Sequence, residues 1–128
     1  MLFELSTIKS PAEVSAALHS AAKNHQFGVM HVHNLKETMA KKGVDFPREC
    51  LVLEVCQPQQ AKKVLEEDMS ISTALPCRIS VYERDGKTVI ATLKPTALLA
   101  LFGVPHLESV AREVEDTILQ IMKEAAAS

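Results

Sequence analysis

Two cysteines, Cys56 and Cys77, stand where strand-like segments end and begin, and their thiols are the groups best placed for chemistry. The run Cys50–Cys56 is apolar at nearly every position, and Cys77–Glu83 alternates apolar with polar residues, so both are predicted strands. If these strands are antiparallel neighbours, the two thiols lie at the same edge of the sheet. Such a pair suits either the binding of a small ligand or soft metal, or thiol–disulfide exchange in which Cys56 attacks and Cys77 resolves.

Cys56 is predicted to be the more reactive thiol of the pair. A helix is expected to begin near Pro58, and backbone N–H groups at a helix N-terminus stabilise a thiolate and lower its pKa. The alternative is that Cys56 and Cys77 are small buried hydrophobic residues, because free cysteine is among the most buried residue types. Cys50, inside the apolar run, has less to indicate a role in chemistry.

The segment His31-Val32-His33 is a weaker candidate for a metal site. Residues two apart on a strand face the same side, so the two imidazoles are able to share one ion. No adjacent H-x-x-E-H or C-x-x-C element supplies further ligands, and solvent-facing histidines are the alternative. The sequence gives no indication of a cofactor.

Several catalytic signatures are missing from the chain. It has no G-x-S-x-G elbow, no G-x-x-x-x-G-K-[ST] loop and no G-x-G-x-x-G turn, which disfavours nucleotide-dependent enzymes. The carboxylates Glu113, Glu115 and Asp116 are expected on the solvated face of a helix. Whether the protein is an enzyme is therefore left open.

The length and net charge of the chain limit the classes of molecule that it is expected to bind. The chain has 128 residues and a formal charge of -2, too balanced to favour nucleic acid as a partner. No stretch is long and apolar enough for a membrane span, and the first residues do not resemble a secretory signal. We therefore expect a cytoplasmic protein without a membrane partner, with its three cysteines as free thiols. No linker or repeat divides the chain, so residues 1–128 are expected to form one domain.

The elements that must position the thiols are marked by caps, periodicity and turns. Ser10-Pro11-Ala12-Glu13 begins a helix predicted over 11–25, and Asp85-Gly86 predicts a tight hairpin turn between Cys77–Glu83 and Lys87–Leu93. Cys50–Cys56 is predicted to be the central strand. The other predicted elements are strands at 1–8 and 29–34, a short helix from Asn34 to Gly43, a helix from Pro58 to Asp68, a short helix or turn at 96–102 and a long final helix after Pro105.

The order of these elements predicts an α+β fold. Strands and helices alternate early, but the late hairpin excludes a wholly parallel sheet, so two layers are expected with helices on one face. The other face of the sheet would then be uncovered, and a chain with 47% hydrophobic residues commonly covers such a face with a second copy. A homodimer is therefore predicted.

The chain also resembles the bacterial and archaeal domain-of-unknown-function family 302. The resemblance is carried nearly from end to end by Phe27-Gly28-Val29, Val44-Asp45-Phe46, Leu53-Glu54-Val55-Cys56-Gln57-Pro58, Leu75-Pro76-Cys77-Arg78-Ile79-Ser80-Val81-Tyr82-Glu83, Asp85-Gly86-Lys87-Thr88-Val89 and Leu101-Phe102-Gly103. It implies a curved, mostly antiparallel sheet backed by helices, of the TATA-binding-protein-like type, in the order β-α-β-(α)-β-α-β-β-α. It also implies homodimers, and such a fold does not imply DNA binding.

The recurring Cys-x-Pro and Leu-Pro-Cys elements of that family fall on Cys56, Pro58, Pro76 and Cys77. The predicted strand ends lie at the same positions. The leading hypothesis is a small homodimeric domain whose pocket near Cys56, Pro76 and Cys77 binds a small ligand or a soft metal. A thiol-based redox or sulfur-transfer protein using Cys56 and Cys77 is the second hypothesis. A purely structural or protein-interaction dimer is the third.

Overall fold

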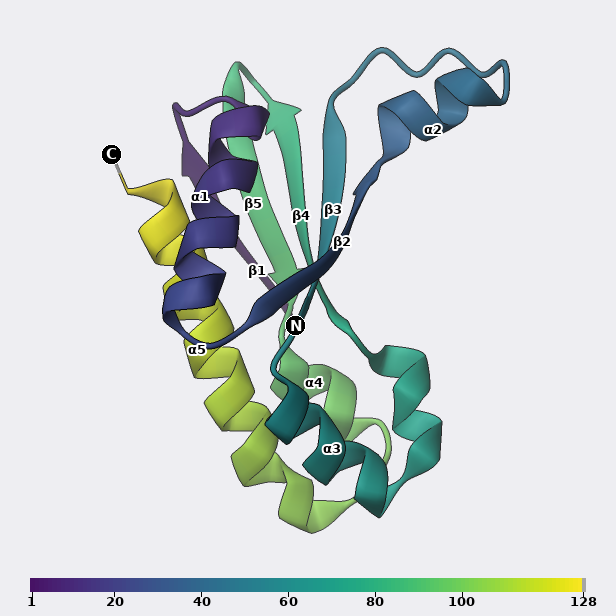
Figure 1. Cartoon of the computed structure of the whole chain (residues 1–128), viewed down its shortest axis with the longest axis vertical. Coiled ribbons are helices and arrows are strands. Elements are labelled where there is room, and N and C mark those ends of the chain that lie inside the picture. The colour runs from purple at the N-terminus through teal and green to yellow at the C-terminus, as the bar shows by residue number, and fades with distance from the viewer. Residues whose placement is uncertain (128) are drawn as a thin grey trace.

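Five antiparallel strands form one open sheet in the computed structural model, which describes residues 1–127 (Figure 1). The sheet order is β1-β5-β4-β3-β2, and every neighbouring pair is antiparallel. The strands are β1 (Leu2–Thr7), β2 (Gly28–Asn34), β3 (Cys50–Cys56), β4 (Cys77–Arg84) and β5 (Lys87–Leu93). The predicted α+β fold with helices backing an antiparallel sheet is confirmed.

The hairpin of β4 and β5 turns where the sequence predicts it. Asp85 and Gly86 both adopt positive φ, at 53° and 77°, as a two-residue turn between right-twisted strands requires. The prediction that Cys50–Cys56 is the central strand is wrong, because β4 is central and β3 lies between β4 and β2. The two faces of β3 differ in burial although both carry apolar residues. Leu53 and Val55 are buried on one face, whereas Cys50 and Val52 are only half-buried on the other.

The first two helices begin at the predicted caps. Helix α1 (Pro11–Asn24) starts after Ser10, whose hydroxyl accepts a hydrogen bond from Glu13 N at 3.2 Å. The carboxylate of Glu13 accepts one from Ser10 N at 3.0 Å, which completes a capping box. Helix α2 (Leu35–Lys41) is capped by Asn34 and has no buried residue, and Figure 1 shows it with the following loop standing away from the rest of the fold.

The remaining short helices lie at the end of the sheet where β3 ends and β4 begins, and the long last helix runs from there along the sheet beside α1 (Figure 1). They are α3 (Pro58–Glu67), a 3-10 helix (Met69–Ala74), α4 (Pro95–Ala100), a second 3-10 helix (Pro105–Leu107) and α5 (Glu108–Ala126). None of the helices within residues 1–127 has the length and apolar character needed to span a membrane.

One acidic residue of α5 is buried, against the expectation of a solvated face. Glu115 is 7% exposed, and its Oε1 accepts hydrogen bonds from Thr96 N at 3.1 Å and Thr96 Oγ1 at 2.6 Å. Thr96 lies in the first turn of α4, which has no side-chain cap of its own. Glu115 therefore caps α4 from a neighbouring helix, a role that only the tertiary structure reveals.

Two clusters of buried apolar residues stabilise the fold. The larger joins one face of the sheet to α1 and α5, and the smaller joins α3, α4, α5 and the 3-10 helices below the sheet. The larger cluster includes Val14, Leu18, Leu53, Val55, Ile79, Val81, Ile90, Ile118, Ile121 and Met122. The smaller consists of Val64, Ile71, Leu99, Leu107 and Ala111.

Candidate functional site

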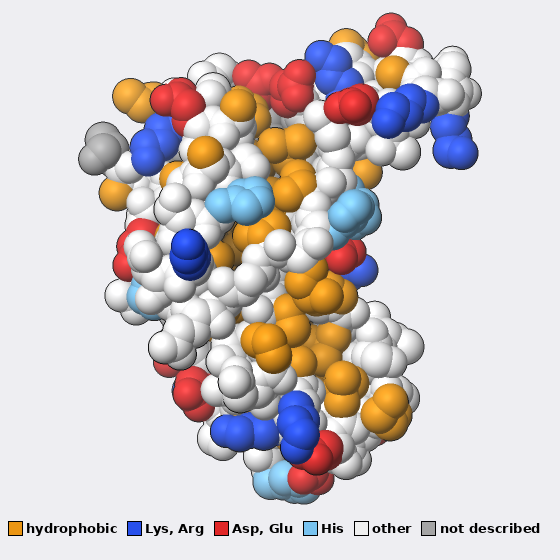
Figure 2. All heavy atoms as spheres, viewed as in Figure 1, with side chains coloured by type: hydrophobic (Ala, Val, Ile, Leu, Met, Phe, Trp, Pro, Cys, Tyr) orange, Lys and Arg blue, Asp and Glu red, His pale blue; other side chains and the backbone are white. Residues whose placement is uncertain are grey.

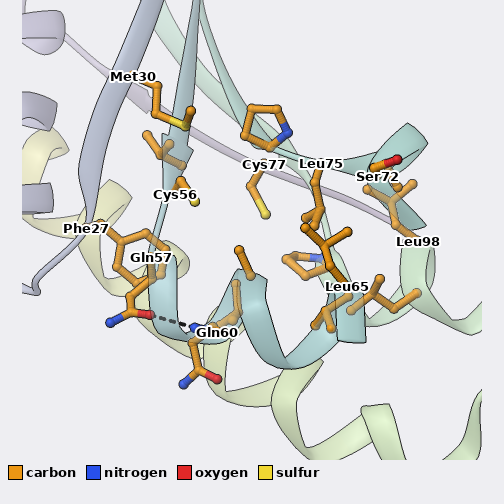
Figure 3. A pocket seen from close by; sticks show the side chains of 18 residues that line it. Phe27, Met30, Cys56, Gln57, Gln60, Leu65, Ser72, Leu75, Cys77 and Leu98 are labelled. Atoms are coloured by element: carbon orange, nitrogen blue, oxygen red, sulfur yellow. Dashed lines mark hydrogen bonds between the residues drawn. The ribbon is translucent and has the colours of Figure 1, made fainter. Parts of the chain in front are cut away.

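A cavity of about 230 Å³ lies where the two hydrophobic clusters meet, and we call it the thiol cavity. Figure 3 shows its lining side chains, and Figure 2 shows hydrophobic side chains gathered between the sheet and α3. The lining residues share one property, which is that none carries a charged side chain. They are Phe27, Met30, Val55, Cys56, Gln57, Gln60, Ala61, Val64, Leu65, Ser72, Ala74, Leu75, Pro76, Cys77, Pro95, Leu98, Leu99 and Val114.

The structure brings Cys56, Pro76 and Cys77 to this one cavity. Strands β3 and β4 are antiparallel neighbours, the arrangement on which the predicted thiol pair depends, and Cys77 lies directly opposite Val55. Cys56 is one residue beyond that pair, so the two cysteines are diagonal neighbours at the end of the sheet. Both are free thiols, and Figure 3 shows both beside the cavity. Cys50 is also free but does not line it, because it pairs with Tyr82 at the other end of β3.

The two cavity thiols are held in their protonated form. Burial, with a smaller contribution from the nearby Cys56, raises the pKa of the Cys77 thiol to about 11. Burial also raises the pKa of Cys56. The predicted lowering of the Cys56 pKa by a helix N-terminus is therefore wrong. The first turn of α3 already has an acceptor, because Gln57 Oε1 accepts a hydrogen bond from Gln60 N at 2.8 Å, and desolvation dominates at Cys56.

A β-bulge places Met30 at the cavity. The β2–β3 register runs from Val29 opposite Val55 to His31 opposite Glu54, which leaves Met30 as the extra residue of β2. A bulge redirects the side chain of the extra residue, and Met30 joins the lining although its surface is 62% exposed. The unbranched thioether side chain of a methionine such as Met30 adapts readily to different apolar ligands.

Neutral polar groups are few in this lining. Gln57, Gln60 and Ser72 supply amide and hydroxyl groups, and Figure 3 shows the two glutamines and Ser72 toward opposite ends of the cavity. Gln60 Oε1 is buried and finds no hydrogen-bond partner within residues 1–127. The cavity can therefore hold an apolar group and offer it a small number of uncharged hydrogen-bonding partners.

The histidine pair lies on the open face of the sheet, away from the thiol cavity. His31 and His33 do face the same side, with ring centroids 4.3 Å apart in an edge-on arrangement. His33 Nε2 donates a hydrogen bond to Glu54 Oε2 at 3.0 Å, and this contact lowers the pKa of Glu54. Within residues 1–127 no three His, Cys, Asp or Glu side chains are grouped as a metal site would need.

Most of the cavity lining was not predicted from the sequence. Phe27, Gln57, Ser72 and Leu98 come from four segments that meet only in the folded chain. Beyond Cys56, Pro76 and Cys77, the apolar stripe of α3 is the sequence signal that points to the lining. Ala61, Val64 and Leu65 recur at helical spacing, and all three line the cavity.

Comparison with known proteins places this architecture in a family. A solved structure titled "Crystal structure of uncharacterized conserved protein DUF302 from Bacillus stearothermophilus" is similar over 97% of both chains, with a TM-score of 0.91 and 30% sequence identity. Among the curated proteins, none matches this chain. The model of the family described as "Domain of unknown function DUF302" matches residues 3–125. The chain therefore belongs to the DUF302 family.

Proposed function

We propose that this protein binds a small, largely apolar molecule in the thiol cavity. The observation that carries the proposal is the lining itself, in which 18 residues converge and none is charged. An apolar cavity of ~150 Å³ is enough to hold a benzene ring, so about 230 Å³ accommodates a somewhat larger apolar group. In this role Cys56, Pro76 and Cys77 form part of the wall, with the protonated thiols acting as polarisable apolar contacts.

A blocking variant tests the proposal. Ala61 lies on α3 in the lining, so Ala61→Phe would fill part of the cavity. Toluene titrated into the labelled protein should shift the NMR methyl signals of Leu65, Leu98 and Leu99 in the wild type and leave them unchanged in Ala61→Phe. Ala40→Phe, on the exposed helix α2, is the matched control and should bind toluene as the wild type does. Equal binding by Ala61→Phe and wild type, or none by either, would contradict the proposal.

The thiol-exchange hypothesis is the second candidate, favoured by the position of two free cysteines at one cavity. Exchange needs a thiolate, and the raised pKa of both thiols leaves little of it near neutral pH. Cys56 and Cys77 also occupy diagonal positions on neighbouring strands, whose side chains start toward opposite faces of the sheet. These features favour binding over redox or sulfur transfer, and over a soft-metal site that requires deprotonated thiols.

Homodimer formation is proposed on a separate ground. The helices cover one face of the sheet, and on the other face Leu2 and its partner Leu93 are 55% and 46% exposed. Pairing with a second copy would bury such a face. Light scattering of the purified protein should give twice the 14.0 kDa of the chain, and a mass of one chain would contradict this proposal.

A further inference from the structure

A second hollow opens beside the thiol cavity, on the face of the sheet that the helices leave uncovered. Its volume is about 340 Å³, and its lining includes Leu2, Val52, Tyr82 and Leu93. The two hollows have four lining residues in common, which are Ala74, Pro76, Cys77 and Leu98. They therefore lie next to each other around the start of β4, where these four shared residues stand between the thiol cavity and the open face of the sheet.

Among residues 1–127, Arg78 is the one charged residue that lines this second hollow. It follows Cys77 directly, and its backbone carbonyl is fixed by a hydrogen bond from Thr92 Oγ1 at 2.7 Å. Its side chain is 55% exposed, and its Nε lies 4.0 Å from Glu54 Oε2, beyond hydrogen-bonding distance. Glu54 accepts its short hydrogen bond from His33 instead. Within residues 1–127, no side-chain hydrogen bond engages the Arg78 guanidinium, which leaves its donors available to an anion.

We propose that the molecule bound by the thiol cavity is an amphipathic monocarboxylate, whose apolar tail occupies the cavity and whose carboxylate is bound by Arg78. This inference rests on the proposed function and names its ligand class. The planar guanidinium offers two parallel N–H donors that match a carboxylate. One cationic side chain indicates one acidic group, and the cavity volume fits a tail or ring of roughly six to ten carbons, by comparison with benzene in ~150 Å³.

The charges around Cys77 are consistent with a carboxylate at Arg78. Cys77, which lines both hollows, is kept neutral because burial raises its pKa, so it does not repel an anion. Glu54 lies opposite Arg78 on the neighbouring strand, and its Oε2 already accepts a hydrogen bond from His33 at 3.0 Å. An incoming carboxylate would share the guanidinium with Glu54, for which its five N–H donors suffice.

Calorimetry with octanoate and 1-octanol tests the inference, because the two differ in charge and share an apolar tail. We expect the wild type to bind octanoate about ten- to a hundredfold more tightly than 1-octanol, the gain typical of a charge-assisted contact. Arg78→Gln should remove that preference and leave the affinity for 1-octanol unchanged, while Arg78→Lys should restore part of it. Arg84→Gln is the matched control, since Arg84 lies on the same face of β4 but pairs with Glu4 at 3.4 Å.

The outcomes separate this inference from the proposed function. Equal affinities of the wild type for the two molecules, or an unchanged preference in folded Arg78→Gln, would overturn the assignment of the carboxylate to Arg78 and leave the cavity as a binding site. Absence of binding by both molecules would overturn the proposed function together with this inference. Circular dichroism of each variant establishes that it is folded.

Discussion

Cys56 and Cys77 lie one register step apart on neighbouring antiparallel strands, and both line one apolar cavity as free thiols. Burial holds both protonated, so they act as part of a hydrophobic wall rather than as a nucleophile and its partner. This relationship underlies the binding function proposed for the cavity, and it has consequences for stability and reactivity that can be measured.

The burial of Cys77 predicts a loss of stability at alkaline pH. Its pKa is about 11 in the folded chain against an ordinary value of 9.0, so the folded state holds the proton more tightly. The resulting stabilisation is fully present below about pH 9 and is lost as the pH rises through 11; by pH 11 the loss is about 2 kcal/mol. Urea unfolding at pH 8 and pH 11 should show a smaller difference in Cys77→Ala than in the wild type. Identical pH dependence in both proteins would contradict this account.

Mild oxidation should leave the cavity thiols largely unmodified. The reactive form is the thiolate, and its fraction near pH 7 is small for both Cys56 and Cys77. Intact-mass measurement after brief exposure to peroxide should therefore show no loss of two protons. Rapid loss of two protons that disappears in Cys56→Ser and in Cys77→Ser would instead support the thiol-exchange hypothesis.

Glu115 should contribute to stability in a way that its exposed neighbours do not. Glu115→Ala removes the acceptor for the two hydrogen bonds from Thr96, and we expect the free energy of unfolding to fall by about 1–3 kcal/mol. Glu115→Gln keeps an acceptor oxygen and should recover part of that loss. Glu113→Ala, on the exposed surface of the same helix, should change stability by less than about 0.5 kcal/mol. Equal effects at Glu113 and Glu115 would show that the cap is not formed.

The capping box of α1 gives a prediction for the N-terminal part of the fold. Ser10→Ala removes the hydroxyl that accepts from Glu13 N, and the expected cost is about 1 kcal/mol in urea unfolding. Ser20→Ala, at an exposed position in the same helix, provides the comparison and should be nearly neutral. A Ser10→Ala protein as stable as Ser20→Ala would argue against the cap.

Local signals in the sequence were sufficient for most of the fold. The capping box at Ser10, the Asn34 cap and the Asp85-Gly86 turn each depend on a few neighbouring residues, and all three occur as predicted. The position of Cys50–Cys56 within the sheet was predicted wrongly, because an apolar run does not reveal which strands will flank it. The burial of Glu115 was also missed, since its partner Thr96 lies on another helix.

The candidate site was predictable only in part. The strand ends indicated Cys56, Pro76 and Cys77, and these residues do share a cavity. The bulge that turns Met30 toward them depends on the pairing of β2 with β3, and composition carries no signal for it. The protonation of the thiols follows from how deeply the tertiary structure buries them, which a helix-terminus argument from the sequence does not include.

The most direct test of a binding function for the thiol cavity is a crystal soaked with bromobenzene and measured at the bromine absorption edge. Bromobenzene is neutral and apolar, and its size suits a cavity of about 230 Å³. We expect an anomalous bromine peak inside the cavity, among Cys56, Cys77 and Leu98. An empty cavity in a crystal that shows bromine peaks elsewhere would contradict it.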